Sequence, residues 1–90
     1  MPNKKIEKYI ENKEHIFFET EVKGVRTVLA YYRNSKELRI KVGGITWEIV
    51  ENVPESQLNE LETYIDKMEM AVDKYLEYLK AHNLFKKWGK

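Results

Sequence analysis

Hydrophobic and polar residues alternate with a period of two between residues 15 and 50. The alternation runs through four segments, HIFFETEV, VRTVLAYYR, KELRIKV and ITWEIV, and is typical of strands with one buried face. Short turns of the length that joins adjacent strands of a hairpin separate the segments: Lys23-Gly24, Asn34-Ser35 and Gly43-Gly44. We therefore predict a four-stranded antiparallel meander over residues 15–50.

All three turns give one consistent register for the meander. The rows that then share one face are Ile16–Tyr31–Leu38–Ile49, Phe18–Leu29–Ile40–Trp47 and Thr20–Thr27–Val42–Ile45. A shift of one residue in any strand would bring polar side chains into these rows. We expect this face to line the core, with Trp47 buried opposite Ile40. On the other face, the expected pairs Glu21–Arg26 and Arg39–Glu48 indicate contact with solvent.

Helical spacing appears on both sides of the meander. Ile6, Tyr9 and Ile10 have the i, i+3, i+4 spacing of a helix, so residues 3–14 are predicted to form a short N-terminal helix. Apolar residues alternately three and four apart predict a long helix over 54–82: Leu58, Leu61, Ile65, Met68, Val72, Tyr75 and Leu79. The fold class is α+β, with the long helix packed on one sheet face and the whole chain, 1–90, forming a single domain.

The predicted long helix exceeds the length of the sheet. A helix over 54–82 would measure about 43 Å, whereas strands of about seven residues span about 23 Å. We therefore expect residues 71–82 to contact a second subunit in a homodimer. The predicted interface residues are Val72, Tyr75, Leu76, Tyr78 and Leu79. The alternative is a monomer in which the N-terminal helix covers the remainder.

Composition excludes several classes of protein. The chain has no cysteine and a formal net charge of +1, which excludes a disulfide framework, a thiolate metal site and the class of polybasic proteins that bind nucleic acid through a long charged tail. No apolar run reaches the roughly 20 residues of a membrane span, so we expect a cytoplasmic protein. His15 and His82 lack metal-ligand spacing, and no serine lies in a nucleophile motif. We expect no enzymatic activity, metal or cofactor. The abundance of Lys, Glu, Ile and Tyr is compatible with a thermophilic source.

Two surfaces are candidates for binding single-stranded nucleic acid, because cations contact phosphates while aromatic rings stack on bases. The first is the basic, aromatic tail over 83–90 with the lysine before it: Lys80, Phe85, Lys86, Lys87, Trp88 and Lys90. Alternatively, Phe85 and Trp88 pack on the body of the protein. The second is the outer sheet face, which resembles aromatic and basic RNA-binding sheets: Phe17, Arg26, Tyr32, Arg39 and Lys41. Alternatively, these bases only pair with the glutamates that give the same face a net negative charge: Glu19, Glu21, Glu37 and Glu48.

The order of the elements, with the heptad from Leu58 to Leu79, resembles small dimeric single-strand-binding proteins of hyperthermophilic archaea, the ThermoDBP type. It resembles more loosely the positive-cofactor family of coactivators, in which a dimerising helix follows a sheet. We predict a dimeric module that binds single-stranded DNA or RNA. The alternative is a protein–protein interaction adaptor, a regulator or a plasmid- or virus-encoded inhibitor. It would act through the apolar helix end or the acidic helix face of Glu62, Asp66, Glu69 and Asp73.

Overall fold

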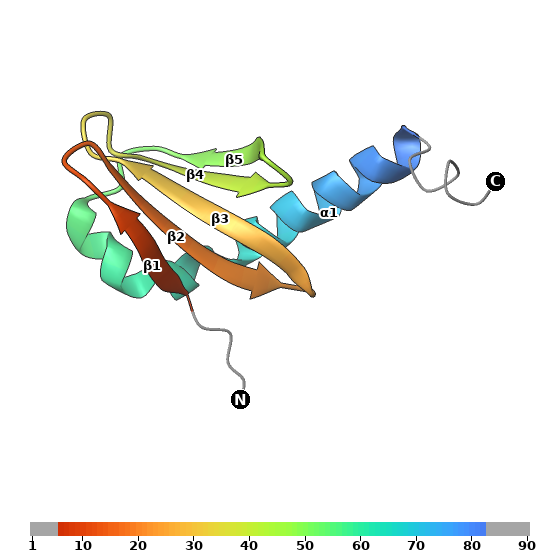
Figure 1. Cartoon of the computed structure of the whole chain (residues 1–90), viewed down its shortest axis with the longest axis horizontal. Coiled ribbons are helices and arrows are strands. Elements are labelled where there is room, and N and C mark those ends of the chain that lie inside the picture. Colours follow the sequence, from red (N-terminus) through yellow and green to blue (C-terminus); the bar gives the residue numbers. More distant parts are fainter. Residues whose placement is uncertain (1–5, 83–90) are drawn as a thin grey trace.

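The computed structural model describes residues 6–82, which form one antiparallel sheet and two helical segments. The strands are β1 (Glu7–Glu11), β2 (His15–Val22), β3 (Val25–Tyr32), β4 (Glu37–Val42) and β5 (Ile45–Val50). They are followed by the 3-10 helix η1 (Glu55–Tyr64) and the α-helix α1 (Ile65–Ala81). The strands lie in chain order across the sheet, and both helical segments lie behind it in Figure 1.

The four-stranded meander over residues 15–50 is confirmed, as part of a larger sheet. Strands β2, β3 and β4 have the predicted register, so that Tyr31 pairs with Ile16 on one side and with Leu38 on the other. All three side chains are at most 3% exposed. They face α1, which adds Met68 and Val72 to the same core, both fully buried.

The register between β4 and β5 differs from the prediction. Ile40 pairs with Glu48 rather than with Trp47. One extra residue in β5, Trp47, forms a β-bulge and shifts everything that follows it. The predicted pairing of Leu38 with Ile49 is wrong for the same reason, and Ile49 is 50% exposed.

The bulge places Trp47 at the margin between the sheet and α1, half-buried rather than enclosed opposite a core residue. Its Nε1 donates a hydrogen bond of 2.9 Å to the carbonyl oxygen of Val42. Its ring makes edge contacts with Tyr75 and Tyr78, at centroid distances of 6.4 and 5.8 Å. The tryptophan therefore joins β5 to α1.

The bulge also changes the partner of Glu48. Its carboxylate forms an ion pair of 2.6 Å with Lys74 of α1. The predicted pair between Arg39 and Glu48 is therefore wrong, and Arg39 pairs instead with Glu37 on its own strand at 2.9 Å.

The predicted N-terminal helix over residues 3–14 is wrong where the structure describes the chain. Residues 7–11 form β1, which pairs with β2 and makes the sheet five-stranded. The Oδ1 atom of Asn12 accepts hydrogen bonds from the backbone N–H groups of Glu14 and His15, at 2.9 and 2.8 Å. These bonds close a turn where a helix would continue. The bulge residue Tyr9 and the next residue, Ile10, lie beside Phe17 on the face away from the core. Ile6 packs against the core instead, so the three apolar residues that predicted a helix do not share one face.

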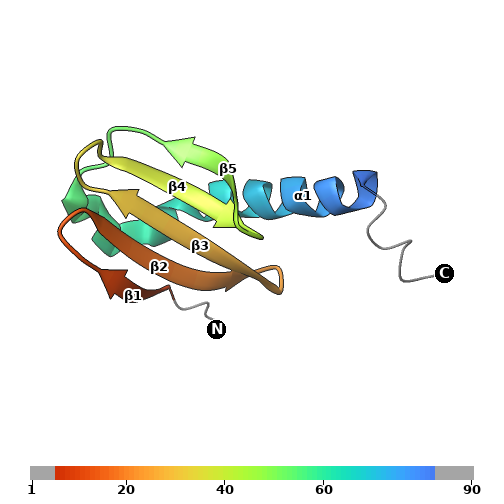
Figure 2. The same cartoon turned by 45° about the horizontal axis from the view of Figure 1, so that its top comes forward.

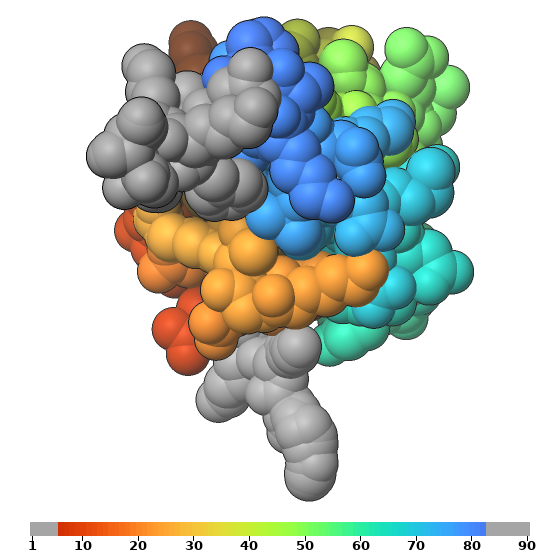
Figure 3. Space-filling model, turned by 90° about the vertical axis from the view of Figure 1, so that its right-hand side faces the viewer, coloured from red at the N-terminus to blue at the C-terminus, as the bar shows by residue number. Residues whose placement is uncertain are grey.

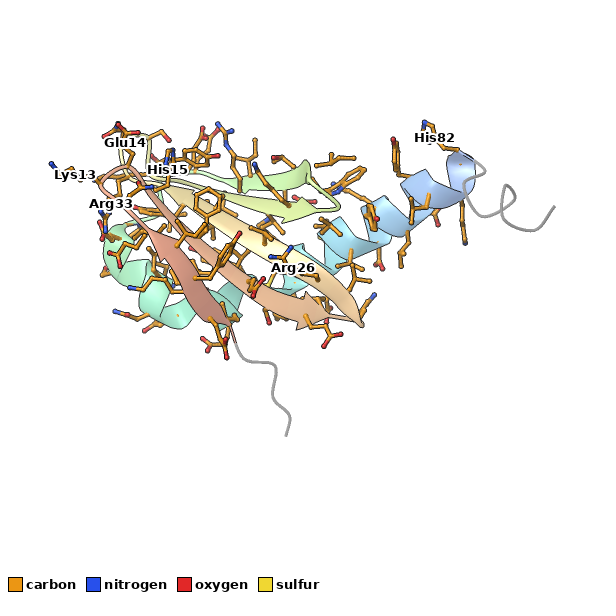
Figure 4. All side chains as sticks on the ribbon, in the orientation of Figure 1. Lys13, Glu14, His15, Arg26, Arg33 and His82 are labelled. Atoms are coloured by element: carbon orange, nitrogen blue, oxygen red, sulfur yellow. The ribbon has the colours of Figure 1, made fainter. Side chains whose placement is uncertain are left out.

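Arg33 fastens this turn to the rest of the fold. Its guanidinium donates to the carbonyl oxygen of Asn12 at 2.8 Å and pairs with the carboxylates of Glu11 and Glu55, at 2.9 and 3.1 Å. Hydrogen bonds from Lys8 and Arg33 lower the pKa of Glu11. Figure 4 shows Arg33 beside this end of the sheet. The edge strand β1 is thereby tied to the start of η1.

The predicted continuous helix over 54–82 consists of two segments. The backbone of Glu60, with φ −129° and ψ 48°, is not helical, and regular α-helix begins at Ile65. With 17 residues, α1 is about 26 Å long. The break lets Leu61 of η1 and Met68 of α1 both reach the core, where they are 3% and 0% exposed.

The C-terminal end of α1 extends past the sheet, as Figures 1 and 2 show. Figure 3 looks onto this end, with α1 (blue) above the β2–β3 turn (orange), where Lys23 and Asp73 form an ion pair of 2.9 Å. Among the helices of residues 6–82, none is long and apolar enough to cross a membrane.

Candidate nucleic-acid interface

The sheet face opposite the helices, here called the open face, is covered by no element that the structure describes (Figures 1 and 2). Four aromatic side chains from three strands form a row of edge contacts across it. The centroid distances are 6.2 Å between Tyr9 and Phe17, 5.9 Å between Phe17 and His15, and 4.8 Å between His15 and Tyr32. We call these four residues the aromatic row.

Two arginines lie against the ends of the aromatic row. The guanidinium carbon of Arg39 is 4.5 Å from the centroid of the Tyr32 ring, and that of Arg26 is 5.9 Å from the centroid of the Tyr9 ring. Such cation–π contacts orient a guanidinium parallel or close to the ring surface. Figure 4 shows Arg26 near the middle of the open face.

Carboxylates hold both arginines in place. The Oε1 atom of Glu19 accepts a hydrogen bond from Nε of Arg26 at 2.7 Å and lies 2.6 Å from Nη2 of the same guanidinium. This interaction raises the pKa of Arg26. Glu37 accepts from Nε and Nη2 of Arg39 at 3.1 and 2.9 Å. Pairs this accessible to solvent contribute little to stability. Their effect here is to fix the direction of the two guanidinium groups.

A hollow of about 590 Å³ lies between the aromatic row and the β4–β5 turn. We call it the Val28 hollow, after the valine in its lining. It is lined by Tyr9, Phe17, Val25, Arg26, Val28, Lys41, Gly43, Gly44 and Tyr75. Two of these residues are cationic, four are aliphatic or glycine and three are aromatic, so the lining suits a flat apolar group with a negative charge.

Three other surface hollows have a different charge. Each is lined by at least two glutamates: one by Glu7, Glu19 and Glu21, one by Glu62 and Glu69, and one by Glu11 and Glu55. A phosphate would meet like charge in all three. The Val28 hollow has no acidic residue in its lining.

The structure brings together the residues predicted on the outer sheet face. All five lie on the open face, because they alternate with core residues and the registers of β2, β3 and β4 are as predicted. They are Phe17, Arg26, Tyr32, Arg39 and Lys41. Sequence reasoning missed two members of the aromatic row. The helix predicted over residues 3–14 removes Tyr9 from the sheet, and His15 is considered only as a metal ligand. The signal that could have linked both to the site is the pair of aromatic residues on the neighbouring strands, Phe17 and Tyr32.

The predicted tail residues are not part of this group. Lys80 lies exposed in the last turn of α1, and Phe85, Lys86, Lys87, Trp88 and Lys90 lie outside the described residues.

The predicted dimer residues have unequal surroundings. Val72 is fully buried in the core of its own chain, so it is closed to a second subunit. Tyr75 and Tyr78 contact Trp47. Leu76, 36% exposed, and Leu79, half-buried, remain accessible at the protruding end.

The acidic helix face and the two histidines show no arrangement for a metal. Asp73 is engaged with Lys23, and this hydrogen bond raises the pKa of the Lys23 ammonium. His15 belongs to the aromatic row, whereas His82 stacks beside Tyr78 at the far end of α1 (Figure 4). Within residues 6–82, no group of three or more potential ligands could hold a metal ion.

No protein family matches the sequence, and no characterised protein or solved structure is detectably similar to it.

Proposed function

We propose that the protein binds single-stranded DNA or RNA on the open face of its sheet. The aromatic row carries this proposal, because a continuous line of rings on an uncovered sheet is a stacking platform for unpaired bases. Tyr9 at one end is 42% exposed, and the other three rings are half-buried. Their partial burial against one another fixes the rings before a ligand arrives, which lowers the entropic cost of binding.

The cations of the open face support a modest electrostatic contribution. Arg26, Arg39 and Lys41 lie on this face. Lys41 offers one phosphate contact, and a strand whose phosphates displace Glu19 and Glu37 from the two arginines would make three. Each contact with a single strand changes the slope of log K against log salt by about 0.7, so we expect a slope between about −0.7 and about −2. Stacking therefore supplies most of the affinity, in keeping with a chain whose net charge is only +1.

Stacking on rings also requires unpaired bases. A duplex hides its base faces inside its own stack, and its grooves do not fit a flat sheet carrying a line of rings. We therefore expect the protein to prefer single strands to duplexes of the same sequence.

Fluorescence anisotropy with a labelled oligonucleotide of about ten nucleotides tests this proposal, using the full chain and a duplex of equal length as the control. Saturable binding of the single strand, weaker for the duplex, is the expected result. Absence of binding at about 100 µM protein, where even non-specific binders associate, would overturn the proposal. The open face would then be better explained as a surface for a protein partner.

We also propose that two copies of the chain associate through the protruding end of α1. Leu76 and Leu79 continue the apolar stripe that the sheet buries at Met68 and Val72. They belong to the C-terminal half of α1, whose end extends past the sheet in Figure 1. A second copy would cover these leucines while leaving both open faces accessible. Light scattering of the purified protein tests this association, and a monomer mass at high micromolar concentration would contradict it.

A further inference from the structure

We infer that the Val28 hollow is a binding site for one nucleotide, with the base against Tyr9 and Phe17 and the phosphate at Lys41. This inference rests on the proposed function and specifies where one unit of the strand binds. It also predicts binding of a free mononucleotide, which the proposed function alone does not require.

The size and shape of the hollow suit such a unit. Its volume of about 590 Å³ falls within the range of about 300–1,000 Å³ typical of small-molecule sites. One side of the hollow is open at Gly44, where a Cβ atom would meet nothing within 4 Å. At the same turn, the ring of Tyr75 lies against Gly43 and closes the hollow toward α1.

Charge favours this hollow for an anion over the three acidic hollows described above. It combines Lys41 and Arg26 with no carboxylate in its lining, whereas the others each contain at least two glutamates. Arg26 is already paired with Glu19. Among the described residues, Lys41 forms no ion pair, so its ammonium is the group available to a phosphate.

The lining also indicates how selective the site is. The lining contains no amide or carboxylate side chain. Its hydrogen-bonding side chains are the cations Arg26 and Lys41 and the hydroxyls of Tyr9 and Tyr75, which can rotate to donate or accept. Discrimination between bases needs donors and acceptors that match their edges. The site should therefore accept all bases with affinities within about tenfold of one another, which corresponds to about 1.4 kcal/mol.

Amide chemical shifts of the isotope-labelled full chain test the inference, with thymidine 5′-monophosphate as the probe. We expect the amides of Val28, Lys41 and Gly44 to shift in a saturable way, and the amide of Met70 on α1 to stay in place. Thymidine without its phosphate should shift the same amides with at least about fivefold weaker affinity, the loss expected for one charge-assisted contact.

Two matched pairs of variants locate the base and the phosphate. Val28→Glu places a carboxylate in the lining and should raise the Kd of the mononucleotide at least about tenfold, whereas the nearly isosteric Val28→Thr should leave it within about twofold. Lys41→Gln should remove the advantage of thymidine 5′-monophosphate over thymidine. Lys67→Gln, on an exposed part of α1, should not. If Val28→Glu fails to fold, the lysine pair still decides the question.

The outcomes separate this inference from the proposed function. If single strands bind but the mononucleotide leaves Val28, Lys41 and Gly44 unshifted, the nucleotide site is wrong and the proposed function stands. If the mononucleotide shifts these amides but single strands do not bind, the site stands and the proposed function is wrong. The nucleotide site would also be wrong if the amide of Met70 shifts as much as the amides of Val28, Lys41 and Gly44.

Discussion

The ring of Tyr75 occupies the space that a side chain at Gly43 would need. A Cβ atom built on Gly43 would overlap the Cε1 and Cζ atoms of that ring, whereas one built on Gly44 would meet nothing. Both glycines have left-handed backbones, with φ of 65° and 79°. Both residues of the β4–β5 turn therefore favour glycine because of their backbone conformation. Gly43 favours it for a second reason, since the ring of Tyr75 leaves no room for a side chain.

The two glycines give a matched test of this contact. Gly44→Ala should cost about 1–2 kcal/mol, the penalty of a left-handed backbone for a residue with a Cβ atom. Gly43→Ala should cost the same plus about 1–3 kcal/mol for overpacking against Tyr75. Urea unfolding measures both losses. Equal losses in the two variants would show that the Tyr75 ring moves aside without cost.

Tyr31 and Tyr32 are neighbours in sequence on opposite faces of β3, and they should respond differently to loss of the hydroxyl. The hydroxyl of Tyr31, 1% exposed, donates a hydrogen bond of 2.6 Å to the carbonyl oxygen of Val53. Tyr31→Phe leaves that buried acceptor unpaired and should cost about 1–3 kcal/mol. Tyr32→Phe should stay within about 0.5 kcal/mol of the wild type. Thermal or urea unfolding of the two variants checks the difference.

Stability at high pH should also depend on Tyr31. Burial, reinforced by the nearby Glu55 carboxylate, raises the pKa of Tyr31 above the usual value of 10.0. A group with a raised pKa in the folded state stabilises the fold below its unfolded pKa, and this contribution is lost as the pH rises through the folded pKa. The stability difference between the wild type and Tyr31→Phe should therefore be constant from about pH 7 to 9 and shrink above about pH 10. A difference that grows above pH 10 would contradict the assigned direction.

Removal of a ring from the aromatic row should weaken single-strand binding. Phe17→Ala or Tyr32→Ala should each cost about 1–3 kcal/mol, a loss of about 5- to 150-fold in affinity, without a change in the salt slope. Met70→Ala, on an exposed part of α1, is the control. Melting temperatures of the variants show whether any loss reflects unfolding.

Variants in the tail distinguish the two candidate binding surfaces. If the tail carries binding, Trp88→Ala should weaken it without a change in salt slope, and Lys86→Ala with Lys87→Ala should weaken it and flatten the slope together. If the open face carries binding, as we propose, both tail variants should bind within about twofold of the wild type. A large loss in the tail variants and none in Phe17→Ala would move the site to the tail.

Self-association should depend on the two leucines at the end of α1. Leu76→Lys with Leu79→Lys places two charges in the proposed contact, where burial of an unpaired charge is strongly unfavourable, and should give monomers by light scattering. Met70→Lys, at a more exposed position that helical geometry places about 120–180° around α1 from the two leucines, should remain dimeric. Dimers in both variants would show that another surface mediates association.

The register of β2, β3 and β4 could be predicted because each turn was short and each strand alternated without interruption. The bulge in β5 could not be predicted from the sequence. Ile45, Trp47 and Ile49 are apolar at every second position, so they fit a regular strand, and nothing in the pattern marks Trp47 as an inserted residue. The bulge in β1 could not be predicted either, because Ile6 on the core side and Tyr9 and Ile10 on the open face have by chance the spacing of one helical face. An inserted residue changes which side chains share a face without changing the hydrophobic pattern.

The candidate site was predicted only as far as the register was correct. The three cations and two of the rings come from strands β2, β3 and β4, and they lie together on the open face as expected. Tyr9 was not predicted to belong to the site, because its strand was predicted to be a helix. The Val28 hollow depends on the position of Tyr75 against Gly43, which does not follow from a pattern of residue types.

The two bulges have a consequence for solubility. Both inserted residues, Tyr9 and Trp47, lie in the outermost strands of the sheet. A regular outer strand offers a row of free N–H and C=O groups that can recruit strands from other molecules, and an irregular one fits such a partner poorly. Each bulge should therefore hinder the pairing of a further strand with the edge of the sheet. We expect this to protect a protein with an uncovered aromatic face from aggregation by strand addition.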